Sequence, residues 1–210
     1  MNSFLIRTAK PSDAADLLEI YRPYVLETAI TFEYEVPTVE EFTERIRQTL
    51  KRFPYLVLED AAGHPMGYAY ASRFQSRPAY DWAVELSIYL RRDCRGHGYG
   101  FKLYEALERL LRKQNIRNTY ACIAWAETEN IRLDNSSARF HERCGYSLAG
   151  TFHSCGYKFG HWYDMIWMEK HIGPHGTSVQ SVIPFPDLQL SDVLSEIKTA
   201  VQSHTSSKCI

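Results

Sequence analysis

Residues 85–103 constrain the fold of this chain of 210 residues more than any other stretch. They begin with a mainly apolar run, Leu86-Ser87-Ile88-Tyr89-Leu90, which is typical of a β-strand. A charged turn then leads into glycines at positions 96, 98 and 100. Leucines follow at the spacing of one helix face, at positions 103, 107, 110 and 111. The stretch therefore predicts a strand, a glycine-rich loop and an amphipathic helix, in that order.

A helix that follows such a loop can bind an anion at its N-terminus. Its first amides have no partner within the helix, and the helix dipole makes that end mildly positive. Glycine lets the main chain approach an anion closely, and basic side chains at positions 91, 92, 95 and 102 add mobile positive charge. We therefore expect a pyrophosphate site in this loop. The cofactor-binding residues predicted there are Arg95, Gly96, His97, Gly98, Tyr99, Gly100 and Phe101.

The spacing of the loop argues against two common nucleotide motifs. A Walker loop requires Gly-Lys-Ser/Thr, whereas Gly100 is followed by Phe101-Lys102-Leu103. A dinucleotide fingerprint is spaced G-x-G-x-x-G in the first βαβ unit, whereas this loop reads G-x-G-x-G far from the N-terminus. ATP, GTP and NAD are therefore poor fits. By itself, a glycine-rich turn is equally compatible with a tight connection that binds nothing.

Three further segments accompany the loop: residues 80–85 (YDWAVE), 140–146 (FHERCGY) and 156–164 (GYKFGHWYD). Together with the string Arg95-x-x-Gly98-x-Gly100, they resemble the GNAT acetyltransferase superfamily, and within it the phosphinothricin and methionine sulfoximine N-acetyltransferases. The resemblance runs from about residue 6 to residue 170. It implies an α/β (α+β) GNAT fold, with a mixed, mostly antiparallel central sheet of about seven strands that is flanked by helices and splayed between strands 4 and 5.

Composition limits the class of protein. The chain is 45% hydrophobic with a net charge of -1, which suits an ordinary soluble protein and argues against nucleic acid as the main partner. We find no apolar run of membrane length and no signal peptide, so we expect a cytoplasmic protein without a membrane partner. Five cysteines without a C-x-x-C pair indicate reduced thiols and no metal site.

The chain divides into two parts. Residues 1–170 carry the resemblance to GNAT N-acetyltransferases, and residues 171–210 read as a linker and a short amphipathic helix. Ser191 would cap this helix, and its apolar stripe would consist of Leu190, Leu194, Ile197 and Val201. Such a helix must cover an apolar surface on its own domain or on a second subunit, and residues 203–210 should be frayed. We expect a homodimer.

Three residues are predicted to be catalytic. Glu85 lies within an apolar run, and burying an unpaired carboxylate is costly, so an idle glutamate is improbable there. The resemblance places the general base at Glu85, an assisting histidine at His141 and an aromatic acid for the thiolate at Tyr146. The alternatives are a salt-bridged strand glutamate, a hydrogen-bonded packing histidine and a core tyrosine.

The resemblance also implies where the pantetheine arm lies. The strand at residues 118–124 would splay from the strand that carries Glu85, leaving main-chain groups free to bond the arm. Ile88, Tyr89 and Leu90 are thus predicted cofactor ligands. Counting back from His141, the family's cofactor-binding asparagine falls on Asp134, and we choose Asn135 beside it, which would also cap the next helix.

Acceptor-binding residues are predicted in three places. Gln75 and Arg77, in the connection at residues 72–81, could hold a carboxylate or phosphinate, although a solvated loop explains them equally well. Ser87 follows Glu85 on the same strand. Lys158 and His161 lie in the loop expected at residues 153–161, which in the resembling enzymes covers the acceptor.

These features predict an N-acetyltransferase. Acetyl-CoA would be the co-substrate, and the primary amine of a small amino-acid-like acceptor would attack the thioester directly after Glu85 removes its proton. One alternative is a protein or peptide N-acetyltransferase, which would share every cofactor residue. The other is an acyl-CoA-binding sensor without catalytic activity.

Overall fold

In a computed structural model, which describes residues 4–202, the strands form one sheet in the order β1-β2-β3-β4-β5-β7-β6. The strands are β1 (Phe4–Thr8), β2 (Tyr55–Asp60), β3 (Pro65–Arg73), β4 (Ala83–Leu90), β5 (Asn118–Trp125), β6 (Ser147–Lys158) and β7 (His161–His171). The α-helices are α1 (Ala14–Glu27), α2 (Val39–Leu50), α3 (Tyr99–Lys113), α4 (Ser136–Arg143) and α5 (Leu190–Gln202).

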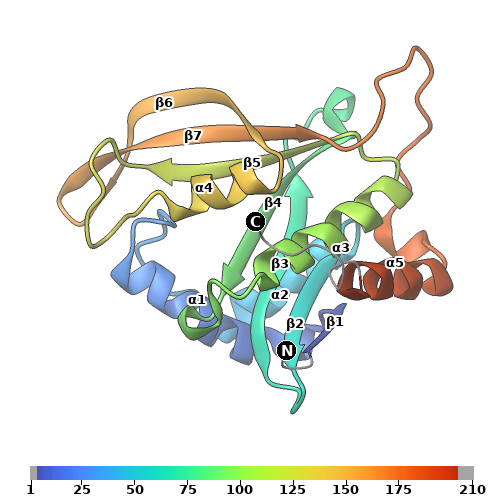
Figure 1. The fold of residues 1–210 in the computed structure, drawn as a ribbon, viewed down its shortest axis with the longest axis horizontal. Helices are drawn as coiled ribbons and strands as arrows, with labels where there is room; N and C mark the ends of the chain where they lie inside the picture. The colour runs from blue at the N-terminus through green and yellow to red at the C-terminus, as the bar shows by residue number, and fades with distance from the viewer. Residues whose placement is uncertain (1–3, 203–210) are drawn as a thin grey trace.

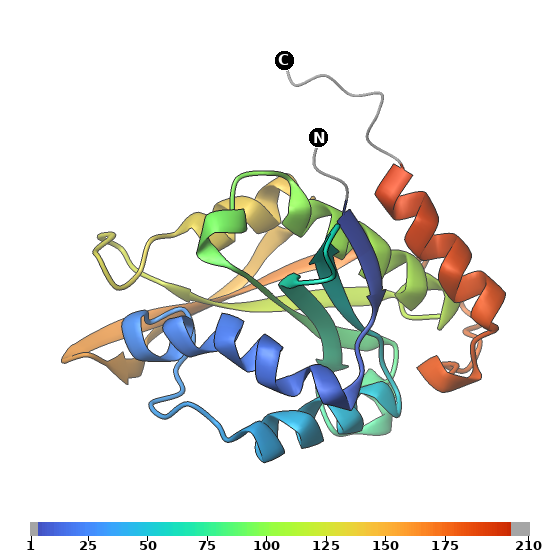
Figure 2. The same ribbon diagram turned by 90° about the horizontal axis from the view of Figure 1, so that it is seen from below.

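All neighbouring strands are antiparallel except β4 and β5, which are parallel. Helices α1 and α2 cover one face of the sheet, and α3 and α4 cover the other (Figure 2). The parallel pair needs a crossover, and α3 provides it. The predicted mixed, mostly antiparallel sheet of seven strands is thus confirmed within the described residues.

The parallel pair separates soon after it forms. Strands β4 and β5 pair at Ala83↔Asn118, Val84↔Thr119 and Glu85↔Tyr120, and no pairing between them is present beyond that point in the described chain. The two strands then diverge toward their C-terminal ends (Figure 1). The predicted splay between strands 4 and 5 is confirmed, and it begins at Glu85.

The periodic leucines fix α3 on the sheet. Leu103, Leu107, Leu110 and Leu111 are all fully buried in the main core. Gly100 allows close approach, because a Cβ there would lie 3.1 Å from the ring of Phe140 and 3.4 Å from Ile88. Helix α3 therefore holds the glycine-rich loop against both β4 and α4.

The C-terminal helix packs on its own domain. Helix α5 contacts α3 and β1, and the ammonium of Lys102 donates to the Ala200 carbonyl at 2.8 Å. Two details of the prediction are wrong. The helix begins at Leu190, so Ser191 lies inside it, and the buried residues are Val193, Ile197 and Ala200 while Leu194 is exposed. Helix α5 thus packs into the main core through Val193, Ile197 and Ala200. Residues 203–210 lie outside the described residues.

Strands β6 and β7 form a long hairpin where a loop was expected at residues 153–161. Pairing continues to Lys158↔His161, and the turn is closed by Phe159 and Gly160, whose φ angles are +50° and +77°. A left-handed pair of residues matches the twist of a two-residue hairpin, so no longer loop is needed. Within residues 4–202, no helix combines the length and the apolar character needed to cross a membrane.

Candidate active site

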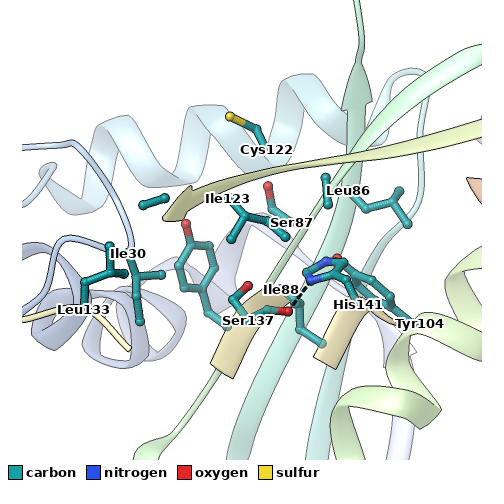
Figure 3. Close-up of a pocket in the computed structure, with 13 residues that line it drawn as sticks. Ile30, Leu86, Ser87, Ile88, Tyr104, Cys122, Ile123, Leu133, Ser137 and His141 are labelled. Atoms are coloured by element: carbon teal, nitrogen blue, oxygen red, sulfur yellow. Dashed lines mark hydrogen bonds between the residues drawn. The ribbon is translucent and has the colours of Figure 1, made fainter. Parts of the chain in front are cut away.

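A cavity of about 50 Å³ opens where β4 and β5 diverge. Strand β4 lines it with Ser87, Ile88 and Tyr89, and β5 contributes Cys122. From the opposite side, α3 and α4 contribute Tyr104, Ser137 and His141 (Figure 3). The cavity therefore brings together four of the predicted site residues, namely Ser87, Ile88, Tyr89 and His141.

The edge of β4 faces the gap with alternate residues. The Arg91 amide donates to the Met66 carbonyl, on the side of β3, at 2.8 Å. In an antiparallel pair every second residue bonds the neighbouring strand, so Tyr89 also bonds β3. The main-chain groups of Ile88 and Leu90 therefore point the other way, toward the gap. Leu90 is not free, however. The hydroxyl of Tyr24 donates to the Leu90 carbonyl at 2.6 Å and lies 3.3 Å from the Leu90 amide. The expectation of an unpaired main chain is wrong for Leu90 because α1 brings Tyr24 to that point.

The glycine-rich loop is open. Gly96 and Gly98 each have a φ of +79°, a left-handed conformation that side chains disfavour, and a Cβ at either position would meet no atom within 4 Å. Gly98 is the N-cap of α3, whose first helical bond runs from the Lys102 amide to the Gly98 carbonyl at 3.3 Å. The loop thus has the space and the helix terminus that a diphosphate requires.

The charged side chains near this loop differ in where they point. The guanidinium of Arg95 lies 5.0 Å from the centroid of the Tyr24 ring, at the end of the gap. Arg91 pairs with Asp93, and Arg92 pairs with Glu27. Lys102 does not reach the loop, because its ammonium is buried under α5, as described above. Its predicted contribution of mobile charge is therefore wrong.

Glu85 is half-buried beside the cavity. Within residues 4–202, its carboxylate makes no hydrogen bond and no ion pair, and burial raises its pKa above the ordinary value of 4.5. Glu85 shares a face of β4 with Ser87, which lines the cavity, and it stands directly beside Tyr120 of β5. A half-buried, unpaired carboxylate with a raised pKa is suited to accepting a proton.

His141 and Tyr104 form a hydrogen-bonded pair in the cavity wall. The Nδ1 atom of His141 lies 2.7 Å from the Ser137 carbonyl, which can only accept, and burial lowers the pKa of His141 to about 4. The ring is therefore neutral with its proton on Nδ1. The Tyr104 hydroxyl must then donate to Nε2, across 2.9 Å (Figure 3).

The predicted tyrosine, Tyr146, lies elsewhere. It does not line the cavity, and its buried hydroxyl lies 3.4 Å from Glu108, which also binds Lys170. Packing against α3 keeps it in the core, which is the alternative of a core tyrosine. Tyr104 of α3 lines the cavity together with Tyr89 of β4, and the sequence did not indicate Tyr104 because it lies next to the leucine stripe of α3.

Asn135 is also placed differently from the prediction. Its Oδ1 accepts from the Ala126 amide at 3.2 Å and its Nδ2 donates to the Ala126 carbonyl at 2.8 Å. The side chain therefore ties the loop after β5, makes no cap bond to α4 and does not line the cavity. Its neighbour Asp134 accepts instead from the Ser136 amide at 3.0 Å, at the first turn of α4.

Four of the predicted acceptor residues do not line the cavity. Gln75 and Arg77 are exposed and do not line the cavity. Lys158 is buried, because the hairpin register turns it inward, and its ammonium donates to the carbonyls of Val25 at 2.8 Å and Thr31 at 2.7 Å. It therefore holds the end of α1, and its predicted contact with the acceptor is wrong. His161 lines a second cavity of about 310 Å³ beyond the end of β5.

The structure adds one thiol that the sequence did not single out. Cys122 lines the cavity on the side of β5 away from His141 and Tyr104 (Figure 3). Cys122 is exposed, but the protein groups crowded around its thiol partly desolvate it, and this, reinforced by the nearby charge of Glu85, raises its pKa to about 12. The thiol stays protonated at neutral pH, which makes it a poor nucleophile.

Comparison with known proteins identifies the family. The family model described as an acetyltransferase (GNAT) domain matches residues 6–167. The phosphinothricin N-acetyltransferase of Streptomyces viridochromogenes is 32% identical over 165 residues, covering 79% of this chain and 86% of its own. The L-methionine sulfoximine/L-methionine sulfone acetyltransferase of Pseudomonas aeruginosa is 34% identical over 173 residues, covering 80% and 95%.

Solved structures agree as well. The phosphinothricin acetyltransferase of Sinorhizobium meliloti, crystallised with acetyl-CoA, superposes with a TM-score of 0.76 at 33% identity and covers 88% of this chain and 96% of its own. The chain is thus an acetyltransferase of the GNAT family. The resemblance drawn from the glycine-rich loop and its companion segments is confirmed.

Proposed function

We propose that this GNAT acetyltransferase transfers the acetyl group of acetyl-CoA to the primary amine of a small amino-acid-like acceptor, of the phosphinothricin or methionine sulfoximine type. One observation carries the proposal. Glu85, a half-buried carboxylate without a partner among the described residues, stands at the point where β4 and β5 separate. The names of the similar enzymes support the class of acceptor.

The cofactor would run along the gap. Residues 95–101 would hold the diphosphate at the N-terminus of α3, where Gly96 and Gly98 leave space for it. The pantetheine arm would then bond the main chain of β4 at Ile88, beside Tyr89. At Leu90 it would have to displace the Tyr24 hydroxyl. We retain Arg95 as the basic side chain of this site, since it lies at the same end of the gap.

The chemistry would be a direct attack. An acceptor amine is protonated at neutral pH, and Glu85, directly or through a water, would take the proton so that the free amine can attack the thioester carbonyl. The amide of Ile88 would stabilise the charge that develops on the carbonyl oxygen. The C–S bond then breaks and CoA leaves. Cys122 is unsuited to carry the acetyl group, because its thiol stays protonated.

His141 would act by position. Its pKa of about 4 and the hydrogen bond at each ring nitrogen make it unfit as a base at neutral pH, so its proposed role is to hold the cavity wall with Tyr104. On the other face, Ser87 would contact the acceptor beside Glu85. Gln75 and Arg77, in the connection after β3, would contact the acceptor from another side, and Arg77 would bind its carboxylate.

We further propose a cytoplasmic homodimer. Free thiols at positions 94, 122, 144 and 155 suit a reducing compartment. The hairpin of β6 and β7 exposes large apolar side chains, among them Leu148, Phe152 and Trp162, and such a surface is typical of a subunit contact. Sedimentation of the purified protein, which would give a mass of twice 24.3 kDa, tests this part.

CoA release across a panel of amines tests the function. The panel contains amino acids, phosphinothricin, methionine sulfoximine and peptides, and the Glu85→Gln variant is the control. Turnover of free amino acids or their analogues, lost in that variant, is the expected result. Preference for peptides would make the protein a peptide N-acetyltransferase. CoA binding without turnover on any amine would make it a sensor.

A further inference from the structure

We infer that the acceptor carries an apolar or aromatic side chain and a single acidic group, so that amino acids such as phenylalanine and methionine are better substrates than phosphinothricin. This inference rests on the proposed acetylation of a small amino-acid-like amine. It is carried by a group of aromatic rings beside Glu85, which we call the aromatic shelf and which consists of Phe74, Tyr120 and Trp167.

The rings of the aromatic shelf support one another. Phe74 stacks on Tyr120 with ring centroids 4.3 Å apart and planes inclined by 19°. Trp167 stands edge-on to Phe74 at 5.4 Å and to Tyr120 at 6.5 Å. All three side chains remain partly exposed, so the shelf presents an ordered apolar surface to a ligand.

The shelf adjoins the proposed base. Tyr120 is the β5 residue paired with Glu85, and residues paired in register share a face of the sheet. Two residues further along β5, Cys122 lines the cavity and is paired with Trp167 of β7. The shelf therefore extends from Glu85 on the face away from α3 and α4, where an amine would meet the carboxylate.

Most basic side chains that could hold a second acidic group of the acceptor already have partners or line another cavity. Lys158 is buried on main-chain carbonyls, and His161 lines the second cavity. Arg52 and Arg73 both pair with Asp81. Within residues 4–202, Arg77 makes no ion pair, and it lies three positions beyond Phe74 in the connection to β4. One free arginine suits one carboxylate, which every α-amino acid has.

The aromatic shelf would thus bind apolar amino acids more tightly than phosphinothricin. An apolar side chain loses contact with water when it lies on the aromatic shelf, and this stabilises the complex. The phosphinate of phosphinothricin would be desolvated there without a cation, which is costly. Because a single methylene in a hydrophobic pocket is worth about 10–200-fold in discrimination, and these side chains differ by more than one methylene, we expect a preference of at least about tenfold for the apolar acceptors even on the partly exposed shelf.

The test is kcat/KM for acetylation of L-phenylalanine, L-methionine, L-glutamate and phosphinothricin, in the full-length protein and in two variants. Phe74→Ser removes one ring of the shelf from a connection outside the sheet. Leu5→Ser is the matched control, since Leu5 is 54% exposed on β1, at the far edge of the sheet, and belongs neither to the shelf nor to the hairpin of β6 and β7. Thermal melting of both variants checks that they are folded.

We expect Phe74→Ser to lower kcat/KM for phenylalanine and methionine by about 10-fold or more, mainly through KM, with little change for glutamate or phosphinothricin. Leu5→Ser should change none of them. The inference is overturned if phosphinothricin or glutamate is acetylated as well as the apolar amino acids by the unaltered protein. An equal loss for all acceptors in folded Phe74→Ser would also overturn it, because the ring would then act on the fold alone.

Failure of this inference differs from failure of the proposed function. If no amine on the panel releases CoA, the acetylation of amino acids itself is refuted. If acetylation occurs with the opposite order of acceptors, only the role of the aromatic shelf is refuted.

Discussion

The two sides of the gap between β4 and β5 contrast in how their polar groups are satisfied. On the helix-side wall, formed by Tyr104, Ser137 and His141, each ring nitrogen of the histidine has a hydrogen-bond partner. On the acceptor-side face, formed by Glu85, Ser87 and Cys122, the carboxylate has no partner within residues 4–202 and the thiol is held neutral. The contrast indicates that the wall maintains shape while the open face retains one unpaired carboxylate, Glu85, for chemistry.

The largest expected effect is on the open face. Replacing Glu85 by Gln should lower kcat/KM at neutral pH by about 10²–10⁴-fold, because the proton acceptor is lost. The loss should shrink at high pH, where the amine is already deprotonated. CoA release from pH 6 to 10 measures this, and equal activity at every pH would remove Glu85 from its role. Exposed Glu127→Gln is the control.

The same variant should not be destabilised. Burial raises the pKa of Glu85 in the folded state, so the folded protein binds a proton more readily than the unfolded chain does. The stability from this group is therefore present below the unfolded value of 4.5 and is lost as pH rises through the raised pKa. Glutamine cannot ionise, so the Glu85→Gln variant avoids this loss of stability. Its melting temperature at pH 7 should equal or exceed that of the unaltered protein. A clear decrease would mean that the carboxylate has a structural partner.

The next effect is on the wall. His141 has a folded pKa of about 4 against 6.5 in the unfolded chain, so its contribution is complete above pH 6.5 and is lost as pH falls through 4. The shift corresponds to about 3 kcal/mol. Tyr104 and Tyr146 face the ring, and neither is charged in this range. Denaturant unfolding at pH 7, 5.5 and 4.5 should show a smaller acid loss in His141→Asn, whereas parallel curves would contradict a buried neutral histidine.

A smaller effect is expected at the partner of that histidine. Replacing Tyr104 by Phe leaves Nε2 of His141 buried without a donor, which should lower the free energy of unfolding by about 1–3 kcal/mol. Tyr157→Phe, on an exposed tyrosine of β6, is the matched control and should change little. Denaturant unfolding of both variants decides whether the wall is held by this bond.

The smallest effect should be at Cys122. Because its pKa of about 12 keeps the thiol protonated, Cys122→Ala should retain kcat within about a factor of two. Mass spectrometry of the protein mixed with acetyl-CoA should find no acetyl group on Cys122. An acetylated thiol, or a large loss of activity, would show that the open face works through a covalent intermediate.

Local patterns in the sequence predicted the elements that carry the site. The run ending at Leu90, the glycines at 96 and 98 and the leucine spacing of α3 are short-range features, and each has its expected structure. The sheet order and the splay followed from family resemblance. Neither periodicity nor spacing alone would have specified them.

The errors share one physical origin, which is contact between segments distant in the chain. A lysine near a turn usually faces water, but the register of β6 turns Lys158 under α1. An asparagine before a helix often caps it, but the side chain of Asn135 is hydrogen-bonded to the main chain of Ala126. Tyr104 and Tyr146 are both buried tyrosines in apolar surroundings, and packing alone decides which one lines the cavity.

The hydrogen bond between Tyr24 and Leu90 affects what a measured affinity for CoA would mean. The Tyr24 hydroxyl already occupies the amide and carbonyl of Leu90, so a cofactor that reaches this point exchanges one hydrogen bond for another. The measured dissociation constant would then report a difference between incoming and outgoing partners. Tyr24→Phe should accordingly strengthen CoA binding and slow product release, since no side-chain hydroxyl would then compete with CoA for the main chain of Leu90.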